Sequence, residues 1–167
     1  MLELIDSTPL LTLTGAGGSG KTRLAIQAAA ELVDEFADGV WFVSLAALTD
    51  PELVSPTIAT VLGAKHDLID FLRPKRLLLV VDNLEQLLPA AAAPIADLLK
   101  APNLQLLATS RERLAVAGEQ EYAVPTLTHD DAIALFVTRA RQLNSAFVPD
   151  ENVGEIANPP RWAAAGA

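Results

Sequence analysis

Hydrophobic residues recur along the chain in short, nearly continuous runs, separated by stretches whose apolar spacing is that of helices. Strands are predicted for five of these runs, at residues 10–14, 40–45, 76–81, 104–109 and 121–124. Three of the runs are apolar almost throughout, as in strands buried on both faces, and Trp41 and Phe42 are also predicted to be core. The alternation predicts an α/β sandwich with a mainly parallel sheet.

Four helices are predicted between and after these strands, at residues 21–36, 51–62, 84–100 and 129–142. Asp50 is expected to cap the second helix, which has proline at its first position, and Gly63 is expected to end it. Pro89 should interrupt or kink the third helix, because proline lacks the N–H that a helix interior needs. Thr128 and Asp131 form a plausible capping box for the fourth.

A glycine-rich segment follows the first predicted strand and leads into the first predicted helix. It matches the phosphate-binding pattern G-x-x-x-x-G-K-T in the setting where a P-loop occurs, and the alternative is an ordinary glycine-rich turn. Lys21 is expected to reach the β- and γ-phosphates and Thr22 to place its hydroxyl on Mg²⁺, while Arg23 either lines the site or is solvated. The pattern covers Gly15, Ala16, Gly17, Gly18, Ser19, Gly20, Lys21 and Thr22.

Asp82 follows the most apolar of the predicted strands. In P-loop ATPases such an aspartate holds the magnesium ion through its water shell, as the Walker B group. Alternatively, Asp82 and Asn83 form only a turn with no metal role. The P-loop sixty residues upstream favours Thr22 and Asp82 as the metal-binding pair.

Arg111 follows the strand predicted at 104–109, at the strand-end edge where open α/β sheets bind ligands. It could contact a γ-phosphate and distinguish a triphosphate from a diphosphate. The alternative is a solvated arginine in a charged loop, and the spacing leaves both interpretations open.

Four segments in a fixed order resemble the NTPase domain of the STAND class, signal-transduction ATPases related to NB-ARC domains. The resemblance spans about residues 8–147 and is greatest to ATPases of bacterial LuxR-type and cyclase-linked regulators. It implies a P-loop NTPase three-layer sandwich followed by the start of a helical subdomain, with ATP or ADP and Mg²⁺ bound. It also implies that Arg111 is the sensor arginine and that Pro125 lies near the hinge and the cofactor. The segments are LTLTGAGGSGKTRLA from Leu11, VVDNLEQL from Val80, ATSRERL from Ala108 and GEQEYAVPTL from Gly118.

Proteins of this class usually act as switches, off with ADP and on with ATP, and not as fast hydrolases. Many energetic ATPases have a glutamate after the Walker B aspartate, where this chain has Asn83, which cannot act as a base. Glu85 is the nearest acid, and it either takes part in catalysis or only complements a helix dipole. Slow ATP hydrolysis is therefore possible, with Lys21, Asp82, Glu85 and Arg111 as candidate catalytic residues. The rival functions are a turnover ATPase or phosphotransferase and a degenerate protein-interaction scaffold.

Charge and composition limit the partners. The net charge of −9 disfavours direct contact with nucleic acid, whose binding depends on neutralising phosphates. The apolar runs are too short to cross a bilayer, and the first residues do not resemble a secretory signal, so a cytoplasmic protein is expected. The expected partners are the nucleotide and other domains of a parent protein, such as a DNA-binding helix-turn-helix or a cyclase, with oligomerisation possible in its ATP state.

Three parts of the chain are expected: residues 1–127 as NTPase core, 128–147 as the first helix of a lid subdomain, and 148–167 as a tail. The resemblance implies that a Gly-Arg-Glu motif before the P-loop and a Gly-Leu-Pro-Leu-Ala motif after the lid are missing, so the chain is expected to be a fragment. Trp162 is encoded by TGG, which gives glycine when it is read one nucleotide later. That frame permits Gly-Leu-Pro-Leu-Ala, which suggests an out-of-frame, disordered tail from about residue 157.

Overall fold

The computed structural model describes residues 1–149 of the 167-residue chain. By its internal contacts the chain divides into two units, Met1–Pro125 and Thr126–Ala167, and each is described by itself. The expected change of reading frame near residue 157 lies outside the described residues.

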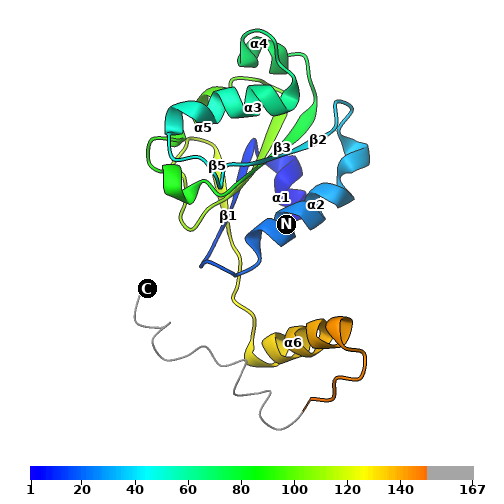
Figure 1. Ribbon diagram of the computed structural model, residues 1–167. Helices are drawn as coiled ribbons and strands as arrows, with labels where there is room; N and C mark the ends of the chain where they lie inside the picture. Colours follow the sequence, from blue (N-terminus) through cyan, green and yellow to red (C-terminus); the bar gives the residue numbers. More distant parts are fainter. Residues whose placement is uncertain (150–167) are drawn as a thin grey trace. The chain divides into compact units, whose positions relative to one another are not determined.

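Five strands form one sheet in the first unit, in the order β2-β3-β4-β1-β5 (Figure 1). Every pair of neighbours is parallel, so the carboxyl ends of all five strands lie at the same edge of the sheet. This confirms the predicted parallel α/β architecture. The strands are β1 (Leu10–Thr14), β2 (Val40–Ser44), β3 (Leu77–Asp82), β4 (Leu104–Thr109) and β5 (Glu119–Ala123).

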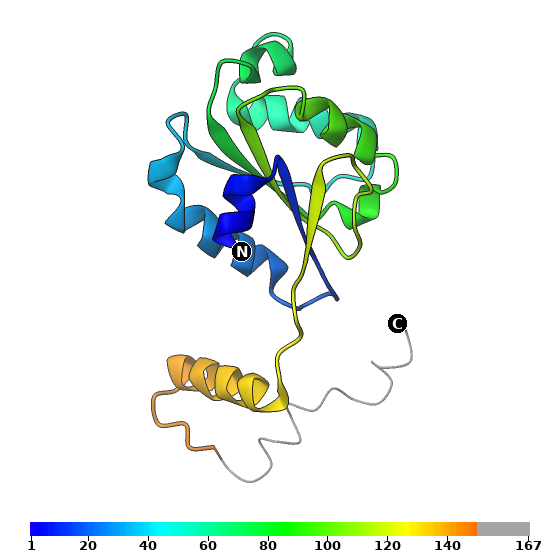
Figure 2. The same cartoon turned by 180° about the vertical axis from the view of Figure 1, so that it is seen from behind.

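Helices cover both faces of this sheet, so the unit has three layers (Figures 1 and 2). On one face α1 (Leu2–Ser7) and α2 (Lys21–Glu31) enclose a core that includes Leu78 and Val80 of β3. The other face is covered by α3 (Val54–Leu62), α4 (Leu68–Leu72) and α5 (Ala92–Leu98). Successive side chains of β3 enter opposite cores, which explains why its sequence is apolar throughout.

Two predicted helices are shorter in the structure. The helix predicted at 21–36 ends at Glu31 and is followed by the 3-10 turn η1 (Val33–Glu35). The one predicted at 84–100 is divided into η3 (Glu85–Leu87) and α5, and a cis Leu88–Pro89 peptide bond lies between them. The interruption at Pro89 was predicted. The short helices α1 and α4 were not.

The first turn of the helix predicted at 51–62 is also 3-10, η2 (Pro51–Leu53), and α3 continues from it. The Asp50 side chain accepts a hydrogen bond from the backbone N–H of Glu52, and Gly63 is left-handed at the other end, so both predicted helix boundaries are confirmed.

The prediction that Trp41 and Phe42 are core residues is wrong, because their exposed fractions are 36% and 42%. β2 is an edge strand that pairs with β3 on one side only, so side chains on both of its faces are flanked by strand residues on one side and are less covered than those of the central strands.

The second unit contains α6 (His129–Leu143). The Thr128 hydroxyl accepts a hydrogen bond from the backbone N–H of Asp131 at 3.2 Å, which confirms Thr128 as the N-cap, and it donates one to the Asp131 carboxylate at 2.6 Å. None of the residues of α6 is buried. Within residues 1–149 no helix has the length and hydropathy that crossing a bilayer would require.

Candidate phosphate-binding site

The loop between β1 and α2 has a backbone that only glycine adopts easily. Gly15, Gly18 and Gly20 have positive φ angles, and a Cβ atom on Gly15 would lie 3.2 Å from Ser19 Oγ and from Val124 O. Gly20 is the N-cap of α2, so the loop ends at a helix N-terminus whose first amides have no partners within the helix. Such an N-terminus is suited to binding an anion.

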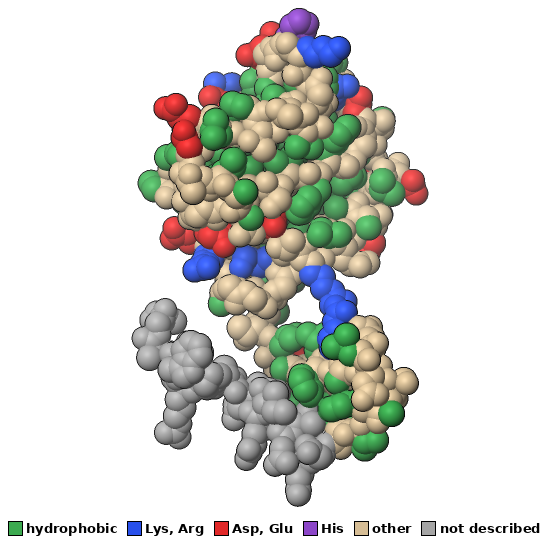
Figure 3. All heavy atoms as spheres, viewed as in Figure 1, with side chains coloured by type: hydrophobic (Ala, Val, Ile, Leu, Met, Phe, Trp, Pro, Cys, Tyr) green, Lys and Arg blue, Asp and Glu red, His purple; other side chains and the backbone are tan. Residues whose placement is uncertain are grey.

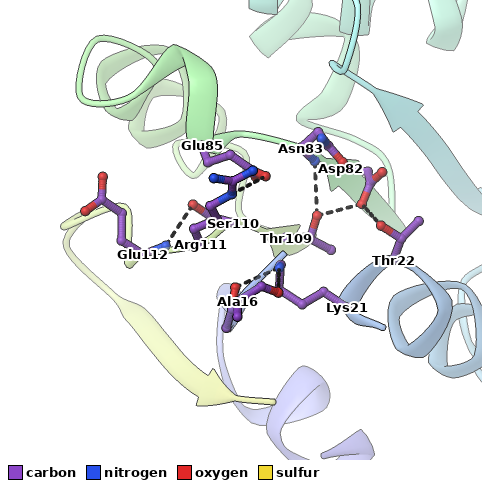
Figure 4. Close-up of polar contacts among 11 residues, drawn as sticks. Ala16, Lys21, Thr22, Asp82, Asn83, Glu85, Thr109, Ser110, Arg111 and Glu112 are labelled. Atoms are coloured by element: carbon purple, nitrogen blue, oxygen red, sulfur yellow. Dashed lines mark hydrogen bonds and ion pairs between the residues drawn. The ribbon is translucent and has the colours of Figure 1, made fainter. Parts of the chain in front are cut away.

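Lys21 is buried, and its ammonium group is held by the loop itself. Nζ donates hydrogen bonds to the carbonyl oxygens of Gly15, at 2.8 Å, and Ala16, at 2.9 Å (Figure 4). An ammonium group has three N–H donors, so these two bonds leave one for another acceptor.

Thr22 and Asp82, sixty positions apart in the sequence, are in direct contact. Thr22 Oγ1 donates a hydrogen bond of 2.7 Å to Asp82 Oδ1, which also accepts one of 2.6 Å from Thr109 Oγ1 (Figure 4). Thr109 in turn accepts the backbone N–H of Asn83 at 3.0 Å. The aspartate and Thr109 are both buried, so the ends of β3 and β4 fix the carboxylate that faces α2.

Asn83 turns the chain out of β3. Its φ angle of 66° is in the left-handed region, which asparagine enters more readily than most residues. The backbone N–H of Leu84 then bonds the carbonyl oxygen of Thr109 at 3.1 Å. This turn brings Asn83 and Glu85 to the carboxyl edge of the sheet beside the loop between β1 and α2.

A pocket of about 420 Å³ lies at this edge, and most of the predicted site residues line it. Arg111 and Glu85 face each other there, with 3.5 Å between Arg111 Nε and Glu85 Oε1. Arg111 comes from the loop after β4, and Glu85 from η3. The lining residues are Gly17, Gly18, Gly20, Lys21, Thr22, Arg23, Asn83, Glu85 and Arg111.

Other predicted residues are placed differently. Gly15 and Ala16 accept hydrogen bonds from Lys21 through their carbonyl oxygens. Asp82 and Pro125 do not line the pocket, and Asp82 instead accepts the hydroxyl of Thr22. The residue before Pro125, Val124, donates its backbone N–H to Thr14 O at 2.8 Å, which places this part of the chain beside the start of the P-loop. Thr109 was missed as a site residue, because the sequence places its hydroxyl at the end of a buried strand but does not show that this strand lies beside β3.

No protein-family model matches the chain. An uncharacterised protein of Mycobacterium tuberculosis is 41% identical to it over 168 residues, with 92% of this chain and 43% of that protein covered. A protein of the same organism that is provisionally named an HTH-type transcriptional regulator is 41% identical over 170 residues, with coverages of 93% and 19%. The chain thus spans less than half the length of these curated relatives.

Solved structures share the fold at low sequence identity. Cdc6p from Pyrobaculum aerophilum superposes with a TM-score of 0.66 at 17% identity and covers 89% of this chain and 48% of its own. Domain III of the replication initiation protein DnaA from Thermotoga maritima gives 0.62 at 13%, with coverages of 94% and 72%. A signal transduction ATPase with numerous domains and a tetratricopeptide repeat sensor, from Pyrococcus horikoshii, gives 0.54 at 13%, with 92% and 26%. The fold is therefore the α/β fold of P-loop NTPases.

Proposed function

We propose that this chain binds ATP and ADP with Mg²⁺ and acts as the nucleotide-dependent switch domain of a larger regulatory protein of the STAND type. One observation carries the proposal. Lys21, Thr22 and Asp82 converge at the end of a glycine loop whose helix N-terminus adjoins an open pocket.

The loop and Lys21 account for phosphate binding. Among residues 1–149, the first amides of α2 and the third N–H of the Lys21 ammonium group have no acceptor, and phosphate oxygens would supply acceptors. Because the first two ammonium bonds are to backbone carbonyls, the lysine is positioned before the ligand arrives. Hydrogen bonds from a charged donor to phosphate are among the stronger ones in proteins.

The oxygens of Thr22 and Asp82 fit a magnesium ion. They lie 2.7 Å apart and supply a hydroxyl and a carboxylate, the hard oxygen ligands that Mg²⁺ prefers. Residues 1–149 contain no group of three or more His, Cys, Asp or Glu side chains able to hold a metal. The pair of Thr22 and Asp82 suits an ion that is held by one or two protein oxygens together with waters and substrate phosphates. When bound, the ion would neutralise charge on the β- and γ-phosphates.

A switch role is supported more strongly than rapid turnover. Asn83 stands where a catalytic glutamate would be expected, and its side chain cannot take a proton from water. Arg111 lines the same pocket, so we assign it the role of sensing the γ-phosphate. The HTH-type name of one relative, which is much longer than this chain, supports a parent protein that also has a DNA-binding domain.

Equilibrium binding of Mg·ADP and of a non-hydrolysable ATP analogue, measured by calorimetry, tests the proposal. We expect Lys21→Ala to weaken binding of the triphosphate about 10- to 100-fold, because it removes a charge-assisted hydrogen bond of roughly 1.5–3 kcal/mol. Lys65→Ala is the matched control, since Lys65 is an exposed lysine that does not line the pocket, and it should leave binding unchanged.

Two outcomes would support the rival functions. If the folded wild-type chain binds neither nucleotide, a protein-interaction scaffold is the better interpretation. Sustained ATP turnover of several per second that Asp82→Ala abolishes would instead identify a turnover ATPase.

A further inference from the structure

Glu85 is a largely buried carboxylate, and among residues 1–149 its one ion pair is the 3.5 Å contact with Arg111. Its side chain is 19% exposed, whereas that of Arg111 is 68% exposed. Glu85 Oε2 is buried and has no hydrogen-bond partner among residues 1–149. A carboxylate that has lost much of its hydration favours a nearby positive charge, so Glu85 attracts the guanidinium group to its present position.

Arg111 is held in a way that leaves most of its donors free. The contact to Glu85 is made through Nε at 3.5 Å, and a guanidinium group has five N–H donors. A Cβ atom added to Gly17 would lie 3.8 Å from Arg111 Nη2, so the end of the side chain also reaches the P-loop backbone. Figure 4 shows Glu85 and Arg111 facing each other from separate segments of the same edge. Arg111 therefore lies between an internal carboxylate and the loop that would hold phosphate.

We propose that Glu85 competes with the γ-phosphate of ATP for Arg111, and that this competition sets the preference of the site between ATP and ADP. The inference rests on the proposed nucleotide-binding function. A diphosphate leaves the Glu85–Arg111 pair in place. A triphosphate presents a further anion to which the free N–H donors of the guanidinium can bind bidentately, and the pair is then broken. A ligand shifts the equilibrium between paired and unpaired Arg111 only if it interacts differently with those two states. Of the two nucleotides, only the triphosphate does so, because it draws Arg111 away from Glu85.

The test is a double-mutant cycle on the 167-residue chain, with Mg·AMP-PNP and Mg·ADP as probes and Kd measured by calorimetry. Glu85→Gln keeps the shape of the side chain but removes its charge, so we expect Mg·AMP-PNP to bind about two- to five-fold more tightly and Mg·ADP to bind as before. In the Arg111→Met background the same substitution should have no effect on either Kd. Glu112→Gln is the matched control, because Glu112 is an exposed acid next to Arg111 that lies outside the pocket.

Several results would overturn the inference. They are weaker binding of Mg·AMP-PNP by Glu85→Gln, an equal change for both nucleotides, or an effect that persists in the Arg111→Met background. If the wild-type chain binds nucleotide but the ratio of the two Kd values does not move, the competition fails and the proposed function stands. If the folded chain binds neither probe, both fail together.

The wild-type chain gives an independent readout that needs no folded variant. We expect the NMR resonance of the Arg111 Nε–H group to shift when Mg·AMP-PNP is added and to stay in place with Mg·ADP, because only the triphosphate draws the guanidinium from Glu85. Equal shifts with both nucleotides would contradict the competition.

Discussion

Asp82 Oδ1 accepts hydrogen bonds from two hydroxyl groups, one from α2 and one from β4. Of these, the Thr22 hydroxyl is the one proposed to bind magnesium, and it can do so through an oxygen lone pair while its O–H still donates to the carboxylate. Thr109 has no such second role, and it also accepts the N–H of Asn83. It therefore helps to orient the carboxylate whether or not an ion is bound.

Thr109→Val tests this positioning role, since it replaces the hydroxyl with a methyl group of similar size. The change leaves the partly buried Asn83 N–H without its acceptor and Asp82 with one donor fewer, so we expect the free energy of unfolding to fall by about 1–3 kcal/mol. Mg²⁺-dependent nucleotide binding should weaken about tenfold. Denaturant unfolding and calorimetry with and without Mg²⁺ measure the two effects.

Thr109→Ser is the matched control, because serine keeps the hydroxyl and should restore both properties. A valine variant that binds nucleotide with unchanged dependence on Mg²⁺ would show that Thr109 has only a structural role.

Lys21, Thr22 and Asp82 were predicted from the sequence because each belongs to a short local pattern with a fixed spacing. Thr109 and the Glu85–Arg111 pair depend instead on which strands are neighbours. β3 and β4 lie side by side in the sheet, and residues 26 positions apart meet there. No single segment of sequence contains that information, so the identity of Arg111's partner became visible only in the structure.

Among the secondary-structure elements, the ends of α3 show how local sequence sets a boundary. At its carboxyl end Gly63 has a φ angle of 71°, and the next N–H, of Ala64, bonds the carbonyl oxygen of Ala59 at 2.9 Å. A Cβ atom at Gly63 would meet nothing within 4 Å. Glycine is therefore required there by the backbone conformation and not by lack of space.

Gly63→Ala should lower the free energy of unfolding by about 1 kcal/mol, because an L-residue pays this cost in the left-handed region. Gly63→Asn is the comparison variant and should cost less, since asparagine tolerates that region. Denaturant unfolding at a fixed temperature measures both. Equal losses for the two variants would point to a clash with a neighbour and would contradict the backbone explanation.

Strands and helices were predicted most successfully where the local pattern and the fold agree. β1 and β4 have the predicted bounds because long apolar runs with turn residues at their ends leave little choice. The edge position of β2, and with it the exposure of Trp41 and Phe42, depends on sheet order, which the sequence does not encode locally. The short helix α4 is capped by Asp67, whose side chain accepts two backbone N–H groups, but five residues carry too weak a periodicity to be recognised.

At the scale of the whole molecule, the hydrophobic core belongs to one unit. Both buried clusters consist of residues that precede Pro125, and they fill the two spaces between the sheet and its helical layers. Figure 3 shows that apolar side chains also lie dispersed among polar atoms on the visible face of that unit. None of the residues of α6 is buried. The stability of the first unit should therefore be set by its own contacts.

A chain that ends at Pro125 tests this expectation. It keeps every residue of both clusters and all five strands, so we expect it to unfold cooperatively, with a thermal midpoint within a few degrees of that of the 167-residue chain.

A chain that ends at Gly118 is the matched control, because it lacks β5, which pairs with β1 and accepts the Thr14 hydroxyl through Glu121 at 2.7 Å. Removing that strand exposes the far edge of β1 and should lower the midpoint clearly. Circular dichroism measures both, and similar losses from the two truncations would mean that residues after Pro125 help to stabilise the first unit.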